Sequence, residues 1–153
     1  MLRALGAFVG GFDLAGVAAV VGLAHVATVD VIESLVARSL VVHDQIDGRS
    51  RYRLFETTAA YARQRLVDEG EAADVRDRHL DHFYTHALEH PLAMAADLSA
   101  RQHVGPDRAN VAAAFDSAAT HDQWVTAAEL LLGVFTVFDA SPSEGIALTA
   151  DQF

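Results

Sequence analysis

The sequence predicts a mainly α-helical fold that contains one β-hairpin in its first half. Apolar residues make up 52% of the 153 residues, and many of them are Ala and Val, which suit closely packed helices. They recur at helical spacing through most of the chain, but residues 40–54 change to a strand pattern around a turn. A chain of this length can form one ordinary domain or two small ones. We expect two, over residues 1–55 and residues 56–153.

Three helices are expected before the hairpin. Leu2–Phe8 reads as the end of a first helix, which Gly10-Gly11 would stop. Asp13 stands where an N-cap belongs, ahead of an Ala- and Val-rich helix over Leu14–Gly22. A third helix is expected to start at Thr28. Helical spacing places Val29, Ile32, Leu35, Val36 and Leu40 on its buried stripe and Asp30, Glu33, Ser34 and Arg38 on its solvated face.

The hairpin is predicted by two strand-like runs, Leu40–His43 and Arg51–Leu54, on either side of an Asp47-Gly48 turn. Alternation along the second run puts its two apolar side chains on one face and Arg51 and Arg53 on the other. Three helices followed by a two-stranded hairpin is the winged-helix layout. We assign that layout to residues 1–55.

The rest of the chain is expected to be helical. Thr57 or Thr58 can cap a helix that ends at Gly70, and a longer helix over Glu71–His90 would end at Pro91. A short helix or a loop is expected over residues 91–106. The next helix should bury Val111, Ala114, Phe115 and Ala118 on its apolar face.

The last expected helix carries large apolar side chains at helical spacing. They are Trp124, Ala128, Leu131, Phe135 and Phe138. The link before this helix, His121-Asp122, is short, so the two helices should be antiparallel. One helix pair cannot bury such a face alone. We therefore predict that Trp124, Leu131, Phe135 and Phe138 form an interface with a further helix pair.

Charge and cysteine content exclude several classes of function. The net charge is −10, and all 11 basic residues are Arg. Residues 1–55 are balanced, so the acidic excess belongs to the part from Glu56 onward, which makes a non-specific grip on DNA by that part unexpected. The absence of Cys excludes disulfides and thiolate chemistry, and it fits a cytoplasmic protein. The apolar run Leu14–Ala24 is too short to span a bilayer, so we prefer a buried helix to a signal peptide or a membrane span.

Several motifs resemble one family in the right order. Phe8–Leu14 (FVGGFDL) is similar to the F-x-G-G-F-x-L motif in the winged-helix segment of bacterial NB-ARC (STAND) ATPases. Val31–Val41 (VIESLVARSLV) is similar to that family's L-x-x-L-V-x-K-S-L-V motif, with Arg38 in the place of Lys. Arg51–Thr57 with Tyr61-Ala62 resembles R-Y-R-L-L-E-T-I-R-x-Y-A, and Asn110–Phe115 resembles the E-N-L-R-A-A-L that opens a tetratricopeptide-like array.

The resemblance implies a fragment of a larger LuxR-type regulator from an actinobacterium. In that family the winged helix relays nucleotide state between an ATPase module and a sensor built of repeats. The chain contains no Lys, so it has no G-x-x-x-x-G-K-[ST] loop and is not expected to bind a nucleotide by itself. The resemblance places the ATPase core and a DNA-binding helix-turn-helix outside this chain. We expect no cofactor and no enzymatic activity, since no G-x-S-x-G nucleophile motif appears either.

Two overlapping surfaces are candidates for binding. Arg51, Arg53, Glu56 and Tyr61 are our candidates for an interface with another module, because charge and an aromatic ring meet there. Arg49, Arg51 and Arg53 are candidates for a DNA contact by the wing. The expected recognition helix, Asp30–Ser39, exposes two acids and only one cation, which would repel phosphates.

Four histidines, His79, His82, His86 and His90, repeat along one expected helix. His79, His86 and His90 fall on one face, where neutral imidazoles are weak candidates for zinc or nickel ligands or for a pH switch. They could also simply border the core, and we favour a plain interface or surface role over metal binding or a pH switch.

The sequence thus leads to one main hypothesis and two alternatives. The first is a non-catalytic relay and interaction fragment of a STAND-type regulator, with protein partners or other modules of the same regulator. The first alternative is a stand-alone winged-helix transcription regulator that binds DNA. The second alternative is a metal- or pH-responsive helical module. Direct nucleic-acid binding and membrane association are not expected under the main hypothesis.

Overall fold

The computed structural model describes residues 1–46, 48–89 and 105–138, with side chains up to Leu131 in the last helix. It is mainly α-helical with one small antiparallel sheet, as the sequence predicted. In chain order the elements are η1 (Leu2–Ala7), β1 (Gly11–Phe12), α1 (Leu14–Val21), α2 (His25–Ala37), β2 (Val41–Ile46), β3 (Arg49–Leu54), α3 (Glu56–Asp68), α4 (Ala72–Glu89), η2 (Gly105–Asp107), α6 (Arg108–Thr120) and α7 (Trp124–Phe138).

The first six elements form a winged-helix unit. The sheet order is β1-β3-β2, so β3 is the central strand and pairs with both neighbours in antiparallel register. The hairpin prediction is confirmed, although both strands are longer than expected and Asp47 at its turn lies outside the described residues. The strand β1 was missed because it is only two residues long. It forms only because β3 supplies its hydrogen-bonding partner.

The ends of the helices follow local capping chemistry in part. The Asp13 carboxylate accepts a 2.7 Å hydrogen bond from the Gly16 N–H and caps α1, as predicted. Gly22 ends α1 with a left-handed φ of 75°. The expected start of α2 at Thr28 is wrong, because the helix begins three residues earlier. Thr28 lies inside it, buried, and its hydroxyl donates to the Ala24 carbonyl at 3.1 Å.

The start of α3 also differs from the expectation. Phe55 holds the N-cap position and makes no side-chain cap bond, while Thr57 and Thr58 lie in the first turn. The helix packs along η1 at very short range. A methyl group on Gly6 would lie 2.6 Å from the backbone nitrogen of Arg63, so only glycine allows this approach.

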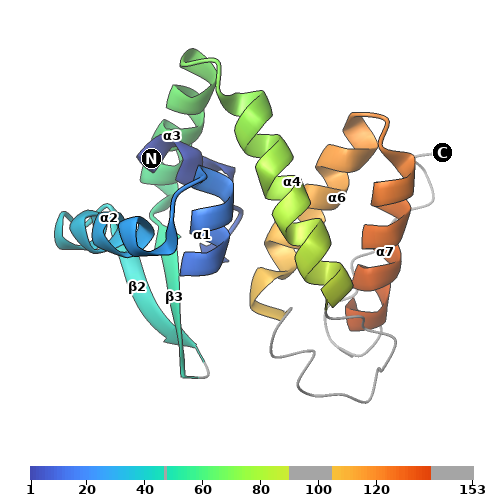
Figure 1. The fold of residues 1–153 in the computed structure, drawn as a ribbon, viewed down its shortest axis with the longest axis horizontal. Coiled ribbons are helices and arrows are strands. Elements are labelled where there is room, and N and C mark those ends of the chain that lie inside the picture. Colours follow the sequence, from blue (N-terminus) through green and yellow to red (C-terminus); the bar gives the residue numbers. More distant parts are fainter. Residues whose placement is uncertain (47, 90–104, 139–153) are drawn as a thin grey trace.

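The core runs without a break from the winged-helix unit into the helices that follow it. Phe8, Phe12 and Phe83 are buried at its centre, with ring centroids 4.8 Å apart for Phe8–Phe12 and 6.1 Å apart for Phe8–Phe83. Helix α4 contributes Phe83 and lies between the winged-helix unit and the α6–α7 pair (Figure 1). Side chains of α4 can therefore contact the winged-helix unit on one side of the helix and the α6–α7 pair on the other.

The α6–α7 pair is antiparallel, as predicted from its short link (Figure 1). Helix α6 buries the expected Val111, Ala114 and Ala118, while Phe115 is half-buried. The interface with a further helix pair that we expect on α7 stays a prediction. Ala127 and Leu130 are buried, whereas Trp124 is 63% exposed and Ala128 is also exposed. The side chains of Phe135 and Phe138, and the expected element over residues 91–104, lie outside the described residues.

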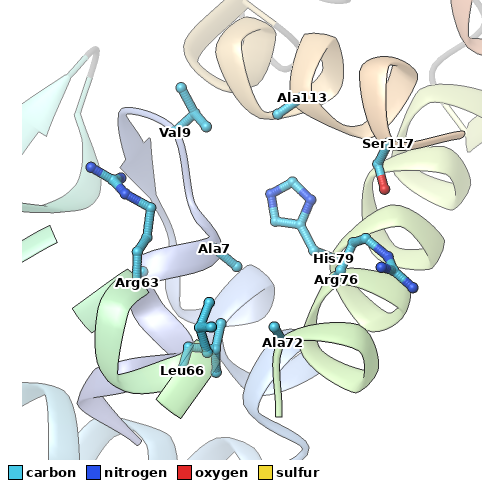
Figure 2. Close-up of a pocket in the computed structure, with 11 residues that line it drawn as sticks. Ala7, Val9, Arg63, Leu66, Ala72, Arg76, His79, Ala113 and Ser117 are labelled. Atoms are coloured by element: carbon cyan, nitrogen blue, oxygen red, sulfur yellow. The ribbon is translucent and has the colours of Figure 1, made fainter. Parts of the chain in front are cut away.

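Among the described residues, no single helix is both long and apolar enough to cross a membrane. Helices α1 and α2 meet that criterion only when joined, and they are bent by 107° relative to each other. Val17, Val20 and Ile32 of this pair are buried in the core. A pocket of about 290 Å³ remains between η1, α3, α4 and α6 (Figure 2).

Candidate functional site

Helix α2 occupies the place of the recognition helix in the winged-helix unit. Its exposed residues include Val26, Asp30, Glu33 and Ala37, and the helix contains no Lys or Arg. Exposed Arg38 follows at its C-cap. The face is thus apolar and acidic, which opposes a close approach to a phosphate backbone.

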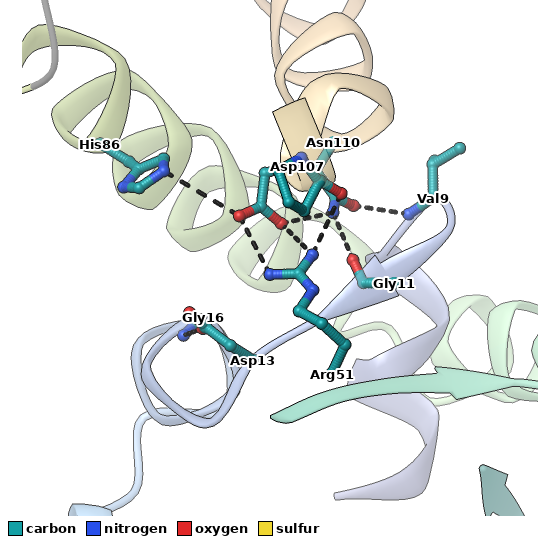
Figure 3. A network of polar contacts seen from close by, with 9 residues as sticks. Val9, Gly11, Asp13, Gly16, Arg51, His86, Asp107 and Asn110 are labelled. Carbon is teal, nitrogen blue, oxygen red and sulfur yellow. Dashed lines mark hydrogen bonds and ion pairs between the residues drawn. The ribbon is translucent and has the colours of Figure 1, made fainter. Parts of the chain in front are cut away.

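Arg51 on the central strand is buried, which contradicts its assignment to a wing contact or to an interface with another module. It is only 7% exposed. Its guanidinium donates to both carboxylate oxygens of Asp107, at 3.1 and 2.5 Å, and to the Pro106 carbonyl at 3.1 Å (Figure 3). The η2–α6 turn covers this face of β3, so the side chain that alternation directs there meets protein and not solvent. Arg51 therefore joins the winged-helix unit to the start of α6.

The other candidate residues of the wing and of α3 remain at the surface. Arg53 pairs with Asp44 of the neighbouring strand at 2.9 Å, and both side chains are about half exposed. Arg49, near the turn, is exposed, and so are Glu56 and Tyr61 on α3. For Arg49, Arg53, Glu56 and Tyr61 the predicted roles stay predictions.

Asn110 on α6 makes a second connection to the winged-helix unit, and sequence reasoning missed it. It is fully buried, and its side-chain oxygen accepts from the Val9 N–H at 2.7 Å. Its side-chain nitrogen donates to the Gly11 carbonyl at 2.8 Å (Figure 3). These bonds satisfy two backbone groups on either side of Gly10, which has a left-handed φ of 90°. The available signal was a polar residue one and two turns before Ala114 and Ala118 on the buried stripe.

Asp107 lies at the centre of this junction. Besides Arg51, it has the Asn110 side-chain nitrogen at 3.5 Å and the His86 Nε2 at 3.9 Å. Residues from β3, α4 and the start of α6 thus meet at one buried carboxylate (Figure 3). The polar network holds three segments together that are 21 or more positions apart in the sequence, as the residue numbers show.

The histidines of α4 border the core. His79 is 4% exposed and packs against Phe8 and Phe83, with ring centroids 5.5 and 4.6 Å away. Burial lowers its pKa to about 4, against smaller opposing effects of Asn110 and Asp107, so its imidazole is neutral at pH 7. Burial also lowers the pKa of His82.

The described part of the chain brings no three His, Asp or Glu side chains together in a way that could hold a metal ion. His82 and His86 stack with ring centroids 6.2 Å apart, and His90 lies outside the described residues. His79 therefore borders the core, which was one of the possibilities considered from the sequence.

Comparison with known protein families agrees with the winged-helix layout of the structure. Residues 1–67 match a family model described as a winged helix-turn-helix domain. This match includes α3, which packs along η1. The chain is also 49% identical over 100 residues to proteins named "Putative HTH-type transcriptional regulator" from two strains of Mycobacterium tuberculosis and one of Mycobacterium bovis. The aligned region covers 63% of this chain and 11% of each relative. No solved structure gave a significant match.

The comparisons confirm part of the resemblance seen in the sequence. The winged helix-turn-helix domain and the homology to HTH-type transcriptional regulators are shown. The NB-ARC or STAND ATPase and the tetratricopeptide-like array are matched by none of these findings, and they stay predictions.

Proposed function

We propose that this chain acts in transcriptional regulation, as a non-catalytic winged-helix segment of an HTH-type regulator that works in the cytoplasm. The observation that carries the proposal is the coincidence of the winged helix-turn-helix match with 49% identity to relatives named as HTH-type transcriptional regulators. These findings favour the hypothesis of a winged-helix transcription regulator over that of a relay in a STAND ATPase.

The charges of the domain bear on what its recognition helix contacts. Specific DNA readers supplement base contacts with several cations that touch phosphates. Helix α2 exposes Asp30 and Glu33 without a cation of its own, and Arg51 of the wing is buried against Asp107. These two observations support contact with protein by α2 as its use within the regulator.

A direct DNA contact is the second candidate, because the relatives carry HTH names and because Arg38 and Arg49 are exposed. Fluorescence anisotropy with a labelled duplex of random sequence separates the two. Binding by a cationic surface has a Kd of about 10⁻⁴ to 10⁻⁶ M at physiological salt and weakens steeply as salt rises. If α2 contacts protein, we expect the chain not to bind the DNA duplex in this range at 150 mM salt. At that concentration the Debye length is about 8 Å, so weak interactions between distant charges are screened.

The contrary result is a Kd for the duplex below about 10⁻⁵ M. In that case the slope of log K against log salt concentration should become smaller by roughly one unit in Arg49→Ala. That result would establish the DNA-binding alternative and dismiss protein contact by α2. The variant Arg65→Ala is a matched control, since Arg65 is also exposed but lies on α3, paired with Glu69. Hydrolysis of ATP by the purified chain would contradict the non-catalytic part of the proposal.

A further inference from the structure

The pocket between the winged-helix domain and the following helices has the size of a small ligand site. Its volume is about 290 Å³. Small-molecule pockets in proteins begin at about 300 Å³, and an apolar cavity of roughly 150 Å³ already holds one benzene ring. The space therefore suits a single ring with one or two substituents.

Small apolar side chains keep this space open. Ala7 of η1, Ala72 of α4 and Ala113 of α6 face it from three elements, and Leu66 of α3 closes a further side (Figure 2). Three alanines that face one another leave a gap that larger side chains would fill. An apolar ring in the pocket would thus contact each of these helices.

Two polar atoms in the pocket wall lack partners. The Nε2 of His79 and the Oγ of Ser117 are both buried and have no hydrogen-bond partner among the described residues. His79 is more than nine-tenths buried, and Figure 2 shows its ring directed into the pocket. Buried polar groups without partners are costly, so such a pair indicates a position for a polar group of a ligand. A hydroxyl group can donate to one atom and accept from the other.

The charged side chains around the pocket are cationic. Arg63 and Arg76 line it, and no acidic residue of the described chain does so, although acids outnumber bases nearly two to one in the whole protein. Arg76 already pairs with Asp77 at 2.8 Å. Arg63 is exposed and has no ion pair within the described ranges. It can therefore take a carboxylate at the rim.

We propose that this pocket binds a small ring-containing carboxylic acid that carries a hydroxyl group. The hydroxyl lies between His79 and Ser117, the ring lies among the alanines, and the carboxylate reaches Arg63. This assignment goes beyond the proposed function and does not depend on it. Because the pocket is walled by the winged-helix domain on one side and by α4 and α6 on the other, an occupant strengthens the contact between them.

The test uses 4-hydroxyphenylacetate as the probe, with two analogues that each lack one group. We expect saturable changes in the amide NMR resonances of Ala7, Ala113 and Ser117 in the full chain. Phenylacetate, which lacks the hydroxyl, should bind about tenfold more weakly, because the two buried atoms stay unpaired. 4-Hydroxyphenylethanol, which lacks the carboxylate, should also bind about tenfold more weakly.

Matched variants locate the site. Ala113→Leu fills the pocket and should abolish the changes, whereas Ala60→Leu, at an exposed position of α3, should leave them intact. Ser117→Ala removes one unpaired hydroxyl with little risk to folding. It should weaken 4-hydroxyphenylacetate about tenfold and leave phenylacetate unchanged.

Three outcomes would overturn the proposal. The first is the absence of saturable changes with any of the three probes at millimolar concentration, which would mean that the pocket holds water only. The second is equal binding by folded Ala113→Leu and by the wild type. The third is equal weakening of all three probes by Ser117→Ala, which would place the hydroxyl elsewhere.

Discussion

The Arg51–Asp107 pair allows a quantitative test of the junction between the winged-helix domain and α6. Both side chains are 8% exposed, and the guanidinium makes two bonds to the carboxylate and one to a carbonyl. Arg51→Met keeps much of the side-chain volume but leaves a buried carboxylate without its cation. Removing one partner of a buried pair costs about 3–5 kcal/mol of unfolding free energy. This is a large part of the total stability of a small domain, which is about 5–15 kcal/mol.

Arg53 provides the matched control within the same strand. Its partner Asp44 and its own side chain are 45% and 49% exposed, so water screens the pair. The loss in Arg53→Met should be about 0–1 kcal/mol. Chemical denaturation followed by circular dichroism measures both losses, provided that the slope with denaturant concentration is unchanged. A loss in Arg51→Met within about 1 kcal/mol of the loss in Arg53→Met would refute the reasoning.

A double variant separates pairing from burial. In Arg51→Met/Asp107→Leu both charges are absent, so no unpaired charge remains in the interior. We expect the double variant to be more stable than either single variant, with a coupling energy of about 2 kcal/mol or more. Additive losses would show that the two side chains do not act as a pair.

The remaining predictions concern three other buried positions. Asn110→Ala leaves the Val9 N–H and the Gly11 carbonyl unpaired, and should cost about 2–4 kcal/mol in denaturation and speed hydrogen exchange at Val9; unchanged exchange would contradict this. The folded pKa of His79, about 4, lies below its ordinary value of 6.5, so the unfolded chain binds the proton more tightly. The contribution of neutral His79 to the unfolding free energy is complete above pH 6.5 and falls by about 3 kcal/mol as the pH drops to 4. Denaturation measured at several pH values should show a weaker dependence of the unfolding free energy on pH in His79→Phe. Gly6→Ala places a methyl group 2.6 Å from backbone on α3 and should lower the melting temperature by several degrees, through a loss of about 1–3 kcal/mol; an unchanged temperature would mean that η1 and α3 separate easily.

Local signals predicted most of the secondary structure. The Asp13 cap and the pairing of β2 with β3 depend on nearby residues, and both are present in the structure. The missed starts of α2 and α3 show the limit of such signals. Thr28, Thr57 and Thr58 each look like caps, but a helix extends past a cap residue when packing favours the added turn.

The candidate site was predicted less well than the fold. Strand alternation correctly placed Arg51 and Arg53 on the same face of β3, but it could not show that the turn before α6 covers only one of them. The acidic partner, Asp107, stands 56 positions away. On α7, the sequence could not show which side of the helix packs within this chain, where Ala127 and Leu130 are buried and Trp124 is exposed.

By itself the sequence determined most of the helices, the hairpin and the acidic character of α2, because periodicity, turn chemistry and charge are properties of nearby residues. Tertiary structure alone decided that Arg51 is buried, that Asn110 satisfies the loop around Gly10, and that alanines from three elements enclose a pocket. Each of these depends on contacts between distant segments. Such contacts form only when the helices pack into one core, because a polar group that is buried there without a hydrogen-bond partner would destabilise the fold.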